Sequence, residues 1–146
     1  MRNVKGVALA ALLLFSGICR ADGLAPAAQQ EIAHLFSYLG GSGCQFERNG
    51  SLHDAKEAVD HLNTKYQYLL RKNMISSAED FIAGAATKSS MSGQAYLVKC
   101  GNAAPVESAA WFQAELAKYR KSVMGQSGVG QSGKAPGSPQ AVARSR

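Results

Sequence analysis

Two groups of polar side chains in this chain could do chemistry. Ser90 and Ser92 could supply a nucleophilic hydroxyl if His53 or His61 acted as the base. The same hydroxyls together with Lys88 could hold an anion among backbone amides. The surrounding residues match no known nucleophile motif, and serines where a helix ends commonly satisfy backbone groups. The sequence therefore favours a structural role for the two serines and leaves the chemical roles open.

The second group lies along one predicted helix. His61, Lys65 and Tyr68 follow one another at spacings of four and three residues, so they share one side of that helix. Exposed side chains with no joint role give the same pattern, and both interpretations stay open. The chain has two adjacent His/Asp pairs, His53-Asp54 and Asp60-His61. The side chains of each pair point apart, because neighbours on a helix do not face each other. The sequence thus predicts no metal site, and it predicts no cofactor.

The first 21 residues have the three parts of an export signal. Residues 1–5 carry two positive charges, residues 7–18 form an apolar run, and small residues at Cys19 and Ala21 occupy the positions read by a signal peptidase. The run is shorter than the roughly 20 residues that span a bilayer. We expect cleavage after Ala21, a periplasmic location and no transmembrane segment afterwards. A buried N-terminal helix and a lipid on Cys19 are the alternatives.

After cleavage two cysteines remain, Cys44 and Cys100, 56 positions apart. An even pair in an exported protein predicts a disulfide, with two free thiols as the alternative. Neither cysteine has a C-x-x-C spacing or a His/Asp cluster beside it, so a nucleophilic or metal-binding role is disfavoured.

The formal charge of +6 is unevenly distributed along the 146 residues. Residues 22–121 hold 10 basic and 10 acidic side chains, so the excess lies in the signal and in residues 122–146. A neutral core without a basic stripe disfavours nucleic-acid binding. Residues 122–146 repeat GQSG and lack aromatic and acidic residues, which predicts a disordered Gly/Ser/Pro-rich tail.

Four helices and two strands are predicted to position the polar residues within one domain, residues 22–121. Apolar spacing and capping residues indicate helices over residues 26–39, 54–72 and 77–86 and from Ser108 onward. Residues 44–48 and 94–100 have strand character, and Asn49-Gly50 is a turn signal. A Cys44–Cys100 bond fits an antiparallel pairing of the two strands. The predicted fold is mainly α, with a two-stranded antiparallel ribbon and one disulfide.

Several short motifs occur in a distinctive order. They are CQFERNG at 44–50, His61-Leu62 with Lys65, AEDFI at 78–82, SSMSG at 89–93 before Tyr96, and Trp111 with Leu116. Together they resemble the DUF5329 family, short exported proteins of Gram-negative bacteria whose function is not established. The resemblance covers residues 32–120, brings no catalytic residues and implies a periplasmic location. It marks as the family pattern Phe46, Arg48, Asn49, Gly50, His61, Lys65, Ser90, Ser92 and Gly93.

Turn geometry explains the Asn and Gly positions of that pattern, but packing does not explain Arg48, His61, Lys65, Ser90 and Ser92. If these five converge, they form a patch suited to an anionic group, such as the carboxylate of a peptide or cell-wall fragment. We therefore expect a non-catalytic accessory or binding module for an envelope protein or such a ligand. The alternative is a small periplasmic hydrolase or transferase that uses Ser90 or Ser92 with a histidine. A stress or stability factor without a small-molecule site is a third interpretation.

Overall fold

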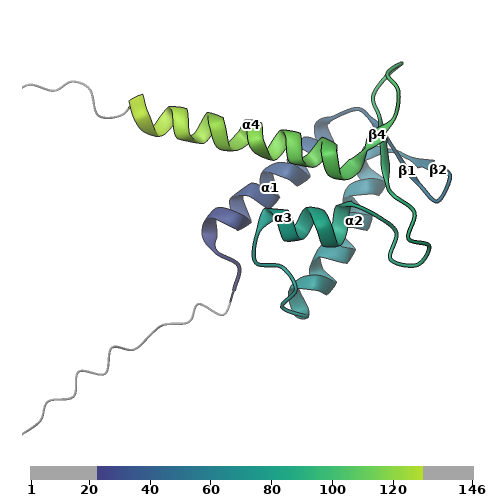
Figure 1. The fold of residues 1–146 in the computed structure, drawn as a ribbon, viewed down its shortest axis with the longest axis horizontal. Helices are drawn as coiled ribbons and strands as arrows, with labels where there is room; N and C mark the ends of the chain where they lie inside the picture. The colour runs from purple at the N-terminus through teal and green to yellow at the C-terminus, as the bar shows by residue number, and fades with distance from the viewer. Residues whose placement is uncertain (1–22, 130–146) are drawn as a thin grey trace, which may run out of the picture.

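The computed structural model describes residues 23–129, with side chains as far as residue 126 (Figure 1). The predicted export signal and residues 130–146 of the predicted tail lie outside this part of the chain, so both stay predictions. Four α-helices, one π-helical turn and four short strands make up the described residues. In chain order they are α1 (Pro26–Gly41), β1 (Gln45–Arg48), β2 (Ser51–His53), α2 (Ala55–Arg71), α3 (Ala78–Phe81), the π turn (Ile82–Ala86), β3 (Leu97–Lys99), β4 (Val106–Glu107) and α4 (Ser108–Val129).

Helix α1 follows directly from its sequence. Pro26 stands in its first turn, where the missing N–H costs nothing. Ile32, Leu35 and Leu39 recur on one face and are buried. The chain leaves the helix through Gly43, whose φ of +63° suits glycine. The helix predicted from the apolar spacing is confirmed.

Capping residues fix where the next two helices begin. Asp54 accepts a hydrogen bond from the backbone N–H of Glu57 at 2.8 Å, and the Glu57 carboxylate accepts one from the N–H of Asp54 at 3.3 Å. Ser77 Oγ likewise accepts from the N–H of Asp80 at 3.1 Å.

The π turn after α3 packs closely on α2. A Cβ added at Gly84 would lie 2.9 Å from Leu69 Cδ1, so a side chain at this position would require Leu69 to move.

The sheet has four strands in the order β2-β1-β3-β4, all antiparallel. The predicted pairing of β1 with β3 is confirmed, with Gln45 opposite Lys99. The prediction of only two strands is wrong. β2 has three residues and β4 has two, so neither is long enough to show an alternating pattern, and each runs directly into a helix start. The turn between β1 and β2 uses Asn49 and Gly50, both with positive φ.

A disulfide joins Cys44 to Cys100, with the two Cα atoms 4.3 Å apart. This confirms the predicted bond. Cys44 directly precedes Gln45, and Cys100 directly follows Lys99. Because Gln45 and Lys99 are paired, the disulfide closes one end of the β1–β3 ladder.

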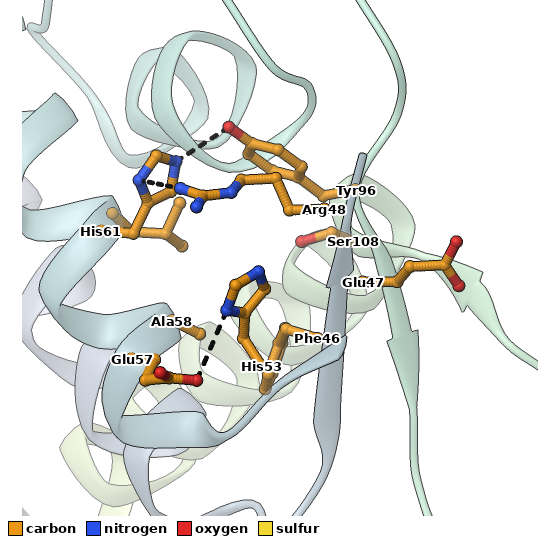
Figure 2. Close-up of a pocket in the computed structure, with 10 residues that line it drawn as sticks. Phe46, Glu47, Arg48, His53, Glu57, Ala58, His61, Tyr96 and Ser108 are labelled. Carbon is orange, nitrogen blue, oxygen red and sulfur yellow. Dashed lines mark hydrogen bonds and ion pairs between the residues drawn. The ribbon is translucent and has the colours of Figure 1, made fainter. Parts of the chain in front are cut away.

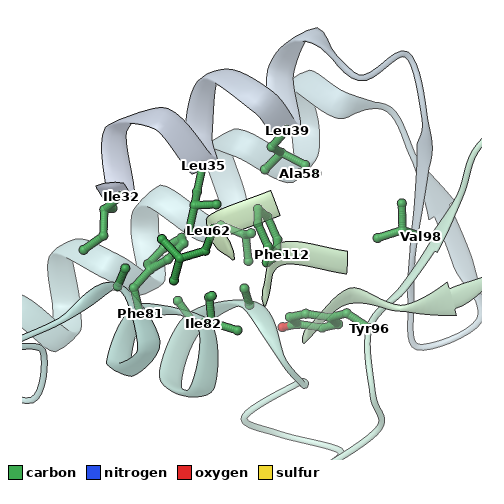
Figure 3. Packing of buried hydrophobic residues seen from close by; sticks show 14 of the residues in the cluster. Ile32, Leu35, Leu39, Ala58, Leu62, Phe81, Ile82, Tyr96, Val98 and Phe112 are labelled. Atoms are coloured by element: carbon green, nitrogen blue, oxygen red, sulfur yellow. The ribbon is translucent and has the colours of Figure 1, made fainter. Parts of the chain in front are cut away.

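The apolar core lies among the four helices, with the sheet closing one end (Figure 3). Phe81 and Phe112 are its largest fully buried side chains. The Phe81 ring centroid lies 5.1 Å from that of Phe36, 5.5 Å from that of Tyr66 and 6.2 Å from that of Phe112. Val98 of β3 closes the core from the sheet side.

Helix α4 is longer than predicted. It has 22 residues, about 33 Å of helix, and continues past the boundary at residue 122 to Val129. Extending an existing helix requires no new nucleation, so residues of modest propensity can continue it.

Arg120 joins α4 to α1 and α3 through two ion pairs. Its Nε lies 2.6 Å from Glu31 Oε1 of α1, and its Nη1 lies 2.5 Å from Glu79 Oε1 of α3. Within residues 23–129, none of the helices combines the length and apolar character of a membrane span.

Candidate functional site

A cavity of about 210 Å³ lies where the sheet meets α2 and the start of α4 (Figure 2). Phe46, Ala58 and Leu62 give it an apolar wall. Such a combination of apolar wall and a few polar groups is typical of a small-molecule site. The polar lining residues are Glu47, Arg48, His53, Glu57, His61, Tyr96 and Ser108.

Strand and helix periodicity explain how these side chains meet. Alternate residues of a strand face the same side, which places Phe46 and Arg48 together. Glu47, between them, also borders the cavity, with its carboxylate directed outward in Figure 2. On α2, Ala58 and His61 are three residues apart and therefore share a face. The turn at Asn49-Gly50 then folds β2 back and brings His53 to the same cavity.

A chain of hydrogen bonds joins Arg48, His61 and Tyr96. Arg48 Nη1 lies 2.6 Å from His61 Nδ1, and His61 Nε2 lies 2.9 Å from Tyr96 Oη. A guanidinium only donates, so Nδ1 must accept and Nε2 must carry the ring proton. His61 therefore donates to the Tyr96 oxygen. The hydroxyl proton of Tyr96 is left available for another acceptor.

Lys65 approaches the same tyrosine from α2. Its Nζ donates to the carbonyl oxygen of Lys88 at 2.8 Å and lies 3.5 Å from Tyr96 Oη. It also stands 5.0 Å from the centre of the Tyr96 ring, within cation–π range. Of the five residues expected to form a patch, the structure thus places Arg48, His61 and Lys65 around Tyr96.

The two serines of the expected patch lie elsewhere. Ser92 Oγ donates to Asn49 Oδ1 at 2.6 Å, and Ser90 is exposed. Neither belongs to the lining of the cavity. Both ring nitrogens of His61 are taken by Arg48 and Tyr96, so that histidine offers no lone pair to a serine.

Burial and neighbouring charges shift the protonation of this site. Burial lowers the pKa of His61, and the positive charges of Arg48 and Lys65 lower it further. Burial also lowers the pKa of Lys65, to about 8, and raises that of Tyr96. His61 is therefore neutral near pH 7. Among the residues that the structure describes, no carboxylate lies within 4 Å of the Arg48 guanidinium, so its charge faces the cavity without a counter-ion.

His53 brings an unsatisfied atom to the cavity. Its Nδ1 lies 3.4 Å from Glu57 Oε2, and its buried Nε2 has no hydrogen-bond partner in the described part of the chain. Figure 2 shows the ring pointing into the cavity, below the side chain of Ser108. Buried polar atoms are nearly always paired in folded proteins. The cavity thus contains one buried nitrogen, His53 Nε2, that no described residue satisfies.

The sequence predicts a functional role for only some of these residues. It marks Arg48 and His61, and it offers His53 only as a base for Ser90 or Ser92. It predicts Ser108 as a helix cap and Tyr96 as a strand residue, with no further role. No local signal marks the last two, because they reach the cavity just before β3 and at the start of α4, 35 or more positions after His61. In residues 23–129, no three His, Cys, Asp or Glu side chains are grouped to hold a metal ion.

The lowered pKa of Lys65 predicts a pH dependence of stability. Between pH 8 and 10 the unfolded chain binds more protons at this lysine than the folded chain does, so the free energy of unfolding rises with pH in that range. We expect a gain of about 1 kcal/mol from pH 7.5 to 9.5, allowing for the partly exposed side chain. Urea unfolding at both pH values measures it.

The variant Lys65→Met keeps the apolar stem and removes the titrating group. Its stability should be flat over the same range, whereas Lys72→Met, at an exposed position near the end of α2, should retain the rise. An equal rise in Lys65→Met and the unchanged protein would contradict the assignment to Lys65.

Comparison with known proteins gives one match. Residues 26–120 match the model of a family described as a family of unknown function (DUF5329). Neither the curated proteins nor the solved structures give a match. The matched residues run from the first residue of α1 to Arg120 of α4 and include every side chain that lines the cavity. Since the match spans well over half of the sequence, the chain belongs to the DUF5329 family.

Proposed function

We propose that the protein is an exported binding module whose cavity takes a small anionic ligand, with a carboxylate as the recognised group. One observation carries the proposal: the guanidinium of Arg48, without a carboxylate partner among the described residues, borders a partly apolar cavity of about 210 Å³. A charged group at such a place is stable when a ligand supplies the opposite charge.

The other polar groups of the cavity fit the same ligand. Tyr96 has a free hydroxyl proton, because His61 donates to its oxygen. The Ser108 hydroxyl and the guanidinium N–H groups not used by His61 are further donors. A carboxylate accepts hydrogen bonds at both oxygens, and its apolar substituent would rest against Phe46 and the neighbouring apolar wall.

The location belongs to the proposal as well. The signal-like first 21 residues and the Cys44–Cys100 disulfide both support export to an oxidising compartment, here the periplasm of a Gram-negative cell. Carboxylates of peptides and cell-wall fragments are the ligands that this compartment would offer. An envelope protein that presents such a group is the corresponding partner.

Calorimetric titration with N-acetyl-alanine tests the binding site. We expect Arg48→Gln to weaken binding at least about 10-fold, because hydrogen bonds to a charged group are worth about 1.5–3 kcal/mol. The uncharged amide of the same compound lacks the carboxylate, so its affinity should be the same for the unchanged protein and for Arg48→Gln.

The matched control is Arg71→Gln. Arg71 is exposed in the last turn of α2, ten residues and about 15 Å of helix beyond His61, so this variant loses the same charge away from the cavity. It should bind as the unchanged protein does. Equal weakening in both variants would indicate a general charge effect, and no weakening in Arg48→Gln would disprove the proposed site.

A further inference from the structure

We propose that the same cavity carries an acyl-transfer site, with Ser108 as nucleophile, His53 as general base and Glu57 as the group that orients the base. The three side chains come from α4, β2 and α2 and all line the cavity. The site is distinct from the serines at 90 and 92, which lie outside the cavity lining.

Ser108 has the placement of a nucleophile. It is the first residue of the 22-residue helix α4, and its backbone N–H donates to the carbonyl oxygen of Tyr96 at 2.9 Å, which fixes the position of the residue. Ser108 is only 1% exposed and lines the cavity, and Figure 2 shows its hydroxyl turned toward the cavity with no hydrogen bond to the other side chains drawn.

His53 has the placement of a base. The carboxylate of Glu57 can only accept, so its contact of 3.4 Å with Nδ1 favours the tautomer with the proton on Nδ1. Nε2 then presents a lone pair, and this is the buried atom without a partner. The bond from Ser108 to a base often closes only when a substrate is bound, so an open Nε2 is compatible with the role.

Arg48 and Tyr96 supply the third requirement, which is stabilisation of developing negative charge. Both border the cavity, and both have N–H or O–H groups that are not used by His61. Preorganised donors of this kind stabilise the oxyanion of a tetrahedral intermediate. The cavity volume limits the substrate to a short acyl ester.

The reaction balances with water as the second substrate. Ser108 Oγ attacks the ester carbonyl carbon while its proton passes to His53 Nε2, and collapse of the intermediate breaks the carbon–oxygen bond as Nε2 returns that proton to the leaving alcohol. Water then attacks the acyl-serine, again giving a proton to Nε2. The acid is released and Ser108 recovers its proton from Nε2.

This inference extends the proposed function, because the released acid is a carboxylate that Arg48 would bind. The two can fail separately. Binding of N-acetyl-alanine by the unchanged protein, weakened in Arg48→Gln, without any serine reactivity in the unchanged protein would leave the binding proposal standing and remove acyl transfer.

Labelling with phenylmethylsulfonyl fluoride, followed by mass spectrometry of peptides, tests the nucleophile. We expect the label on Ser108, no label in Ser108→Ala, and labelling slowed at least about 100-fold in His53→Gln. Release of p-nitrophenol from p-nitrophenyl acetate should follow the same order. Ser37→Ala, which removes an exposed hydroxyl on α1, is the control and should react like the unchanged protein.

Several results would overturn the inference. Absence of label on the folded, unchanged protein would do so, as would a label on Ser90 or Ser92 instead of Ser108. Equal labelling rates in His53→Gln and the unchanged protein would remove the base. The label position is read on the unchanged protein, so the first two outcomes hold even if Ser108→Ala fails to fold.

Discussion

Reduction of the Cys44–Cys100 disulfide is expected to lower the melting temperature by about 15–30 °C. The bond joins residues 56 positions apart, and the loop-entropy relation gives such a closure about 4 kcal/mol. For a domain of about 100 residues, each kcal/mol corresponds to roughly 4–8 °C. Thermal unfolding followed by circular dichroism, with and without a phosphine reductant, measures the shift.

The double variant Cys44→Ser, Cys100→Ser separates the disulfide from other effects of the reductant. It should melt at the temperature of the reduced protein and should not respond to reductant. A reductant shift of the same size in this variant would show that the bond is not its cause. An unchanged melting temperature on full reduction would contradict the stabilising role.

The second large effect is expected for Phe81→Ala, which should lose about 3–5 kcal/mol of unfolding free energy. Phe81 is 0% exposed, and its ring packs against those of Phe36, Tyr66 and Phe112, so truncation leaves a cavity at the centre of the helices. A loss of this size is a large part of the 5–15 kcal/mol typical of a domain. Urea unfolding monitored by circular dichroism gives the number.

Met91→Ala is the matched control for this substitution. Met91 is 99% exposed, so its truncation removes a large apolar side chain without opening a cavity. Its unfolding free energy should stay within about 0.5 kcal/mol of the unchanged protein. A loss below about 1 kcal/mol of unfolding free energy for Phe81→Ala would contradict the prediction. It would mean that the neighbouring rings move into the space left by the Phe81 ring, so that no cavity remains.

The helices could be predicted because their signals are local. The spacing of Ile32, Leu35 and Leu39 defines a buried face within eight residues, and Asp54 and Ser77 act as caps on the amides that follow them. The β1–β3 pairing could be predicted as well, because two cysteines marked one end of the ladder.

The outer strands and half of the site could not be predicted, for a different reason. β2 and β4 exist because β1 and β3 offer free backbone groups at both sides, which no pattern within three or two residues reveals. Ser108 enters the cavity only because its N–H pairs with Tyr96, and His53 only because β2 folds back on β1. Their positions depend on contacts between distant parts of the chain rather than on periodicity.

The shortness of the two outer strands has a consequence for self-association. A sheet edge with free N–H and C=O groups can template the addition of a strand from another molecule, and such growth leads to aggregates. Here β2 passes after three residues into the capped start of α2, and β4 passes after two residues into α4. Leu52 and Val106 are exposed on these strands, yet neither edge is long enough to hold an added strand in register. The fold thus exposes apolar side chains at its sheet edges without offering a template for fibre growth.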